Sequence, residues 1–250
     1  MQVVETSGCW LLSGFVRKPH LSPADFPDAT CLECSANRLR METMFPARLV
    51  LSCPLLLLTA GLLTGGQVRV VGCGQDRLVT AITTLLRMGA RVDLDGEGIT
   101  ASAPDGLRPA AVQTDVHPGF MTDWQTSLMV LFTQADGMSV LHETVYEDRF
   151  VYVPALQAMG AEIELFASCL GGPACRFHDT SSQHSAIVRG VSKLRGAQVD
   201  IPDVRAGFSS VIAAAAAQGS SVLRGVHHLE RGYHRPAEQL RSLGLDLTMT

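Results

Sequence analysis

Three segments of the sequence repeat one another, and this repetition limits the folds that the chain can adopt. Each has apolar residues at helical spacing, then a Gly, then a short stretch that alternates as a strand does. The segments are LLRMGARVDL (85–94), LQAMGAEIEL (156–165) and LRSLGLDLTM (240–249). Gly most readily ends a helix in the left-handed conformation. The repetition therefore predicts a fold made of three copies of one helix-and-strand unit.

A second repeated pattern lies upstream of each segment. It is an apolar helix closed by Gly and followed by a β-branched strand, in LLLLTAGLLTGGQVRVVG, SLMVLFTQADGMSVLHET and SSVIAAAAAQGSSVLRGV. The closing glycines, Gly66, Gly137 and Gly219, are 71 and 82 residues apart. An inserted loop around 170–183, rich in Gly, Ser, Cys and His, explains the longer interval. Each unit is predicted to run helix, strand, helix, strand, strand, which gives an α/β fold.

The third unit stops at Thr250 without the last strand expected in the first two, at about 98–101 and 185–189. Because an unpaired sheet edge is a liability, another segment has to pair there. The N-terminal stretch 2–16 has strand-like residues split by glycines and is the obvious candidate. The stretch 19–37 has Pro, Cys and Asp without periodicity, and we interpret it as a linker.

These features predict two parts of the chain. Residues 1–36 are expected to hold N-terminal strands that pack on the lobe, plus the linker. Residues 37–250 are expected to form one lobe, with repeats at about 48–110, 111–190 and 191–250.

The composition is that of an ordinary globular protein, with 46% hydrophobic and 18% charged residues. The net charge of −4 argues against nucleic acid as a partner, since no basic footprint is present. The apolar stretch 49–63 contains Pro54 and is too short to span a bilayer, so we expect a buried helix and no membrane contact. The N-terminus has Glu5 and no long apolar core, so it does not read as a signal peptide.

Seven cysteines, an odd number without a regular framework, favour a reduced, cytoplasmic setting. Cys31 and Cys34 form a CxxC pair with no second pair at zinc spacing, and are expected to be surface thiols. The histidines His117, His227 and His228 likewise have no partners at zinc spacing. We therefore predict no metal. Walker A, GxGxxG and GxSxG motifs are all missing, and no cofactor is predicted.

Acidic and basic residues occur where the second and third units begin their helices. Thr122 or Asp123 is suited to cap a helix, and Asp123 alternatively to act as a general base beside a ligand. Arg205 and Arg231 come from corresponding rims of one unit, so they can converge as a clamp for phosphate. Surface salt bridges are the alternative for each arginine. The charged segment ETVYEDRF (143–150) has a solvated turn as its more common explanation.

Four segments of the sequence carry a family resemblance. HPGFMTDWQ, ETVYEDRFVYVPALQAMGA, GVSKLRGAQVDIPDVRA and HHLERGYHR, in that order and spacing, resemble the C-terminal lobe of UDP-N-acetylglucosamine 1-carboxyvinyltransferases, of the enolpyruvyl transferase family. The resemblance implies a single lobe shaped as an inside-out α/β barrel of three repeats. It also implies a cytoplasmic transferase of peptidoglycan synthesis that moves the enolpyruvyl group of phosphoenolpyruvate (PEP) to the 3-hydroxyl of a UDP-sugar.

The resemblance also implies roles for individual residues. Asp123 would be the base that takes the proton of the sugar hydroxyl. Arg205 and Arg231 would bind PEP and stabilise the charge of the tetrahedral intermediate. The residues expected to face the UDP-sugar or share the substrate loops are Val145, Tyr146, Arg149 and Asp203.

One departure from the family bears on activity. Between Val16 and Arg48 no counterpart exists for the lobe that carries the general acid and further PEP-binding arginines. We therefore expect the chain to be inactive alone and to need a separate N-terminal lobe. The alternatives are a non-catalytic UDP-sugar-binding, nucleotide-binding or regulatory protein, and an enolpyruvyl transferase half that acts on another nucleoside. Tyr146 and Trp124 are the positions to inspect for a different acceptor.

Overall fold

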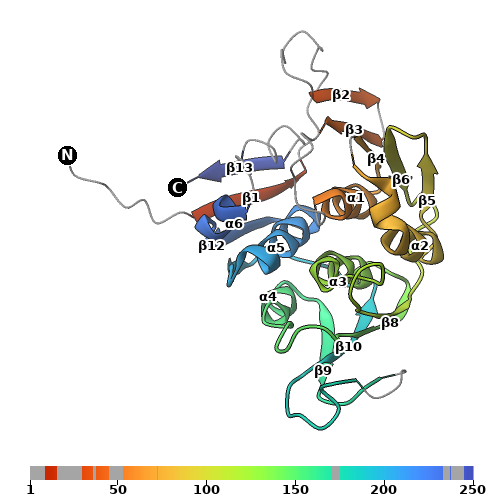
Figure 1. The fold of residues 1–250 in the computed structure, drawn as a ribbon. Coiled ribbons are helices and arrows are strands. Elements are labelled where there is room, and N and C mark those ends of the chain that lie inside the picture. The colour runs from red at the N-terminus through yellow and green to blue at the C-terminus, as the bar shows by residue number, and fades with distance from the viewer. Residues whose placement is uncertain are drawn as a thin grey trace.

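The computed structural model places its elements in three groups (Figure 1). The first two run strand, helix, strand, helix, strand, strand, and the third has the same order except that an N-terminal strand takes the place of the last one. It describes residues 9–15, 30–35, 38–44, 53–71, 73–170, 175–232, 237 and 245–249. The three predicted units are therefore present. Each has one strand more at its start than the sequence pattern predicted.

The first unit has its strands in the order β3-β4-β6-β5. Its elements are β3 (Arg38–Met44), α1 (Cys53–Leu63), β4 (Gln67–Val71), the 3₁₀ turn η2 (Gln75–Leu78), α2 (Val79–Arg87), β5 (Arg91–Leu94) and β6 (Gly98–Ser102). A further strand, β2 (Thr30–Ser35), pairs with β3 and lies in the stretch predicted to be a linker. That prediction is wrong for these six residues. The neighbouring strand β3 alternates polar and apolar residues over Arg38–Met44, a pattern that predicts a strand from the sequence alone.

The second unit repeats this order as β7-β8-β10-β9. Its elements are β7 (Ala111–Gln113), η3 (Thr122–Trp124), α3 (Gln125–Thr133), β8 (Gly137–His142), α4 (Val153–Ala158), β9 (Glu162–Phe166) and β10 (Ser185–Gly190). The predicted insertion falls between β9 and β10. The equivalent connection in the first unit, between β5 and β6, is only Asp95–Glu97.

The third unit borrows its missing strand from the N-terminus, as the sequence predicted. Its own elements are β11 (Gln198–Asp200), α5 (Val204–Ala216), β12 (Ser220–Arg224), α6 (His227–Gly232) and β13 (Leu245–Met249). The strand β1 (Cys9–Phe15) lies antiparallel between β12 and β13, where Leu12 pairs with Ser221 on one side and Leu247 on the other. The sheet order β11-β12-β1-β13 thus matches the other two units.

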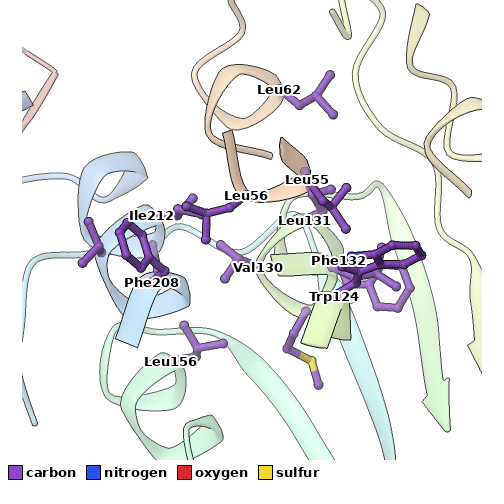
Figure 2. Close-up of a cluster of buried hydrophobic side chains, with 14 of the residues drawn as sticks. Leu55, Leu56, Leu62, Trp124, Val130, Leu131, Phe132, Leu156, Phe208 and Ile212 are labelled. Atoms are coloured by element: carbon purple, nitrogen blue, oxygen red, sulfur yellow. The ribbon is translucent and has the colours of Figure 1, made fainter. Parts of the chain in front are cut away.

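The core lies where one helix from each unit meets the other two. Figure 2 shows apolar side chains of α1, α3 and α5 in contact, among them Leu56, Val130 and Ile212. Every residue of α3 is buried. The apolar stretch 49–63, predicted to be a buried helix, forms α1 over Cys53–Leu63, and its first four residues lie outside the described residues. The helices lie inside and the sheets outside (Figure 1), in agreement with an inside-out α/β lobe. Within the described residues, no helix is both long enough and apolar enough to cross a bilayer.

Candidate functional site

Asp123 lies in the 3₁₀ turn η3, which runs directly into α3. The cap alternative for Thr122 and Asp123 is wrong, because no side chain caps either element. The reason is that residues 122–124 already belong to the helical segment instead of preceding it. The Thr122 hydroxyl donates instead to Oε2 of Glu143, at 2.9 Å. The Asp123 carboxylate is therefore left for partners outside its own helix.

Two arginines from different units approach that carboxylate. Nη2 of Arg149 donates to Oδ1 of Asp123 at 3.1 Å, and Nε of Arg205 lies 3.8 Å from the same oxygen. The Arg149 side chain is only 5% exposed, whereas Arg205 is 48% exposed. The site therefore has one buried, fixed cation and one cation with an open side toward solvent.

Tyr146 lies against both guanidinium groups. The Cζ atoms of Arg149 and Arg205 lie 5.8 Å and 5.5 Å from its ring centroid, within cation–π distance. The residue is 51% exposed, so part of the ring remains available to a ligand. Tyr146, Arg149 and Arg205, all predicted site residues, thus meet around Asp123.

Glu143 anchors the loop that carries Tyr146 and Arg149. It is fully buried, and its Oε1 accepts hydrogen bonds from the backbone N–H groups of Val145 and Tyr146, at 2.8 Å and 2.9 Å. Its Oε2 accepts from Thr122 and, at 2.7 Å, from Gln125 Nε2. The sequence predicted no role for Glu143 beyond a charge in a turn. Because an acid at the end of a strand resembles an ordinary surface charge, only its burial reveals its function.

A buried tyrosine, Tyr152, holds Gln125 in position to contact Glu143. The Tyr152 hydroxyl donates to Gln125 Oε1 at 2.8 Å, which orients the amide toward Glu143. Burial, despite the opposing effect of the nearby Arg149 charge, raises the pKa of Tyr152 well above its usual value. The hydroxyl is therefore a fixed donor. The two hydrogen bonds from Tyr152 to Gln125 and from Gln125 to Glu143 connect the core to the site.

The N-terminal ends of α3 and α5 lie side by side at this place. The Thr126 hydroxyl in the first turn of α3 donates to the backbone carbonyl of Arg205 in the first turn of α5, at 3.3 Å. Asp203 caps α5: its Oδ1 accepts from the backbone N–H groups of Arg205 and Ala206, at 2.6 Å and 2.8 Å. The Asp203 carboxylate thus occupies the end of α5 and positions Arg205.

Arg231 lies in the last turn of α6 and is exposed. Leu229, two residues earlier, packs on Gly207 of α5, where a Cβ would meet its Cδ2 at 2.6 Å. Arg205 lies two residues before Gly207, so both arginines flank the crossing of α5 and α6. Their predicted convergence as a clamp remains a prediction, since no contact between them is seen in the described part of the chain.

Trp124, singled out as a position for a different acceptor, points into the core. It is 1% exposed and meets Phe120 edge-on at 5.5 Å between ring centroids. It therefore does not contact an acceptor directly, which leaves Tyr146 as the exposed position of the two.

A second group of reactive side chains lies at the end of the sheet of the second unit. His142, Cys169, Cys175 and His184 each offer one ligand atom, and these atoms all lie within 4.8 Å of one another. Burial first, and the neighbouring His184 second, lower the pKa of His142, which favours a neutral ring. The prediction of no metal was based on other cysteines and histidines, and none of those belongs to this group. Two of them, His227 and His228, have ring centroids 4.1 Å apart. Cys31 and Cys34 lie in β2, and their side chains are outside the described residues.

Sequence comparison identifies the family. Residues 52–240 match EPSP synthase (3-phosphoshikimate 1-carboxyvinyltransferase). The chain belongs to the EPSP synthase family. This assignment confirms the predicted relationship to enolpyruvyl transferases. It agrees with the mixed α/β fold of the structure.

Curated relatives within this family are similar over most of the chain. A UDP-N-acetylglucosamine 1-carboxyvinyltransferase of Protochlamydia amoebophila is 41% identical over 191 residues, which are 76% of this chain and 41% of that protein. One of Chlamydia abortus is 43% identical over 187 residues, which are 74% of this chain and 42% of that protein. The chain therefore spans about two fifths of the length of these relatives.

Solved structures show the same fold. The enolpyruvyl transferase NikO from Streptomyces tendae has a TM-score of 0.69 and 30% identity, over 80% of this chain and 44% of that one. An EPSP synthase from Acinetobacter baumannii has a TM-score of 0.60 over 88% of this chain and 53% of that one. At 16% identity, the second comparison supports the fold alone.

Proposed function

We propose that this chain forms one wall of the active site of an enolpyruvyl transferase of peptidoglycan synthesis in the cytoplasm. The reaction moves the enolpyruvyl group of PEP to the 3-hydroxyl of a UDP-sugar, UDP-N-acetylglucosamine, and releases phosphate. The observation that carries the proposal is the Asp123 carboxylate held between Arg149 and Arg205. Relatives that share 41% and 43% identity with the chain are named for this activity.

Asp123 is the general base for the sugar hydroxyl. Its Oδ1 faces the two guanidinium groups, while Oδ2 makes no hydrogen bond to any residue that the structure describes. Oδ2 is therefore the atom that accepts the proton as the hydroxyl oxygen adds to C2 of PEP. C3 of PEP is protonated in the same step, and the tetrahedral intermediate then loses a proton from C3 and expels phosphate from C2, which restores the C2–C3 double bond. The contact to Arg149 fixes the carboxylate in place, which is the usual requirement for a positioned base.

Arg205 and Arg231 bind the anionic groups of PEP. The guanidinium of Arg205 has an open side, and a planar guanidinium matches a phosphate or a carboxylate with two parallel hydrogen bonds. Because the Asp203 carboxylate caps the N-terminal end of α5, the positive charge offered to PEP comes from the guanidinium groups. Cations fixed before the reaction stabilise the charge of the intermediate without reorganising.

Tyr146, Val145 and Arg149 form the contact surface for the UDP-sugar. The exposed part of the Tyr146 ring lies over two cations, which suits a ligand with both a flat base and a diphosphate. Glu143 holds the backbone of Val145 and Tyr146, so the loop is rigid before the ligand arrives. Asp203 acts through Arg205, which it positions at the start of α5. The proposed reaction requires no cofactor.

Full activity requires a facing lobe from another chain. The chain matches only 41–42% of the length of its relatives, and Arg205 is half-exposed. A charge pair in open water contributes little, whereas the same groups in a closed, dry cleft act strongly. The second wall excludes water and brings the general acid that protonates C3. We expect no measurable turnover without it.

The test is PEP-dependent phosphate release with UDP-N-acetylglucosamine. The chain is assayed alone and together with a separately expressed N-terminal lobe of the Chlamydia abortus relative. Turnover only with the lobe supports the proposal. Turnover by the chain alone contradicts the need for a second wall. If neither setting gives turnover while calorimetry detects UDP-N-acetylglucosamine binding, the non-catalytic binding protein is the better explanation.

A second candidate is the same chemistry on another nucleoside. The exposed Tyr146 ring favours it, because the ring is open to a flat base whether or not a diphosphate follows. The likeness to the enolpyruvyl transferase NikO supports the chemistry and does not distinguish the acceptor. Competition calorimetry with UDP-N-acetylglucosamine, UDP and uridine separates the two acceptors. Tightest binding of UDP-N-acetylglucosamine supports the UDP-sugar. Equal binding of uridine supports a nucleoside acceptor.

A further inference from the structure

Two histidines, both buried, face each other at the end of the second unit's sheet. His142 ends β8, and His184 directly precedes β10; the backbone N–H of Glu143 donates to the carbonyl of His184 at 2.7 Å. His142 is 2% and His184 1% exposed. Neither ring nitrogen of His142 has a hydrogen-bond partner among the described residues. Because a buried polar group without a partner is destabilising, these unpartnered ring nitrogens indicate that His142 binds a ligand.

Cys169, directly before the insertion, and Cys175, within it, bring their sulfur atoms close together. Sγ of Cys169 lies 3.6 Å from Sγ of Cys175 and 3.5 Å from Nε2 of His184. Zinc forms bonds of about 2.3 Å to sulfur and about 2.0–2.1 Å to nitrogen. In a tetrahedral site these bonds place two sulfur ligands about 3.8 Å apart, and a sulfur and a nitrogen ligand about 3.5 Å apart. The observed distances fit that geometry. All four ligand atoms lie within 4.8 Å of one another, so the wider pairs have to close by about 1 Å when the ion binds.

The surroundings of the four side chains are those of metal ligands. His184 Nδ1 lies 2.9 Å from the carbonyl of Ser182, which fixes the proton there and leaves Nε2 free for a cation. The backbone N–H groups of Cys175 and Phe177 point at the sulfurs of Cys169 and Cys175, both at 3.4 Å. Such contacts stabilise thiolates. The Phe177 ring, 5% exposed, covers His184 at 5.9 Å between ring centroids.

We propose that His142, Cys169, Cys175 and His184 bind one structural Zn²⁺ ion. Two thiolates and two imidazoles in a tetrahedral arrangement select zinc over the hard cations Mg²⁺ and Ca²⁺. Four protein ligands leave no open position, so the ion has a structural role and takes no part in the transfer reaction. The competing arrangement of this group is a disulfide between Cys169 and Cys175.

The zinc ion ties the insertion to the loop that holds the UDP-sugar site. Arg176 donates to the backbone carbonyl of Val145, and the Ser182 hydroxyl donates to Asp148 Oδ1 at 3.0 Å. His142 is also the residue directly before Glu143, the anchor of that loop. We therefore expect the metal to order residues 144–149. This last step rests on the proposed function only for the meaning of the loop, because metal binding itself is measured without substrate.

The first experiment measures metal content and cobalt spectra of the full chain. Protein purified under reducing conditions is expected to hold one zinc ion per chain by mass spectrometry. Replacement by Co²⁺ is expected to give the absorption of a tetrahedral site with a cobalt–thiolate band. Cys169→Ser is expected to weaken zinc binding at least about tenfold. The matched control Cys73→Ser changes a half-buried thiol outside the group and is expected to leave binding unchanged.

Two results overturn the proposal. One is a reduced, folded protein that binds neither Zn²⁺ nor Co²⁺. The other is a metal-free protein whose Cys169 and Cys175 resist thiol reagents until reduced, which identifies the disulfide. Circular dichroism establishes folding of each variant. Hydrogen exchange then tests the loop: zinc removal is expected to speed exchange at 144–149 but not at β5 and β6. Equal exchange at 144–149 contradicts the ordering role.

Discussion

Oδ1 of Asp123 lies 3.1 Å from Nη2 of Arg149, a buried guanidinium carried by the loop of the proposed substrate site. Asp123→Asn leaves that buried cation without its carboxylate. Because hydrogen bonds to charged groups contribute about 1.5–3 kcal/mol, we expect urea unfolding to show a loss of roughly 1–3 kcal/mol. The control Asp136→Asn alters an exposed residue after the opposite end of α3, and is expected to stay within about 0.5 kcal/mol of the wild type. If both variants lose the same free energy of unfolding, the Asp123–Arg149 ion pair does not stabilise the protein.

Glu143→Gln is expected to loosen the substrate loop. The amide keeps one oxygen acceptor but presents an NH₂ group to donors that the carboxylate now satisfies. We expect a loss of about 1–3 kcal/mol in the free energy of unfolding and faster hydrogen exchange at Val145 and Tyr146. Glu147→Gln changes an exposed acid in the same loop and serves as the control. Unchanged exchange in Glu143→Gln would show that the anchor does not hold the loop.

Tyr152→Phe removes the hydroxyl and keeps the ring, so it measures what the hydroxyl contributes to the free energy of unfolding. It removes the hydrogen bond to Gln125 Oε1 and is expected to cost about 1 kcal/mol at pH 7. The pKa of Tyr152 is raised on folding, so its contribution is complete below the unfolded pKa of about 10 and is lost as the pH rises above it. The wild type should therefore lose stability more steeply than the variant between pH 10 and 11. Parallel pH profiles would contradict this.

Leu12→Pro tests the strand that the third unit takes from the N-terminus. Leu12 pairs with Ser221 on one side and Leu247 on the other, so β1 is a central strand. Proline removes a backbone donor and is excluded from central strands. We expect a loss of about 3 kcal/mol or more in the free energy of unfolding. Leu12→Val keeps the donor and is the control. A Leu12→Pro variant as stable as this control would show that β1 is dispensable.

The sequence predicted the repeated units and the pairing of β1 because both leave local signals: glycines at fixed intervals and a unit that lacks one strand. The opening strands β7 and β11 were missed because each has only three residues, too few to show alternation. Asp123, Arg149 and Arg205 were found by resemblance, and the structure brings them together. Glu143 and the cluster around His142 and His184 were missed, because burial and the pairing of β8 with β10 are not visible in local sequence.

The central claim is that Asp123 is the base of an enolpyruvyl transferase whose second wall comes from another chain. Its most direct test is the rate of PEP-dependent phosphate release with UDP-N-acetylglucosamine by the chain plus an N-terminal lobe. We predict turnover that falls by about 10² to 10⁴ in Asp123→Asn, the usual contribution of a general base, and is retained in Asp136→Asn. Turnover at full rate in Asp123→Asn would contradict the account.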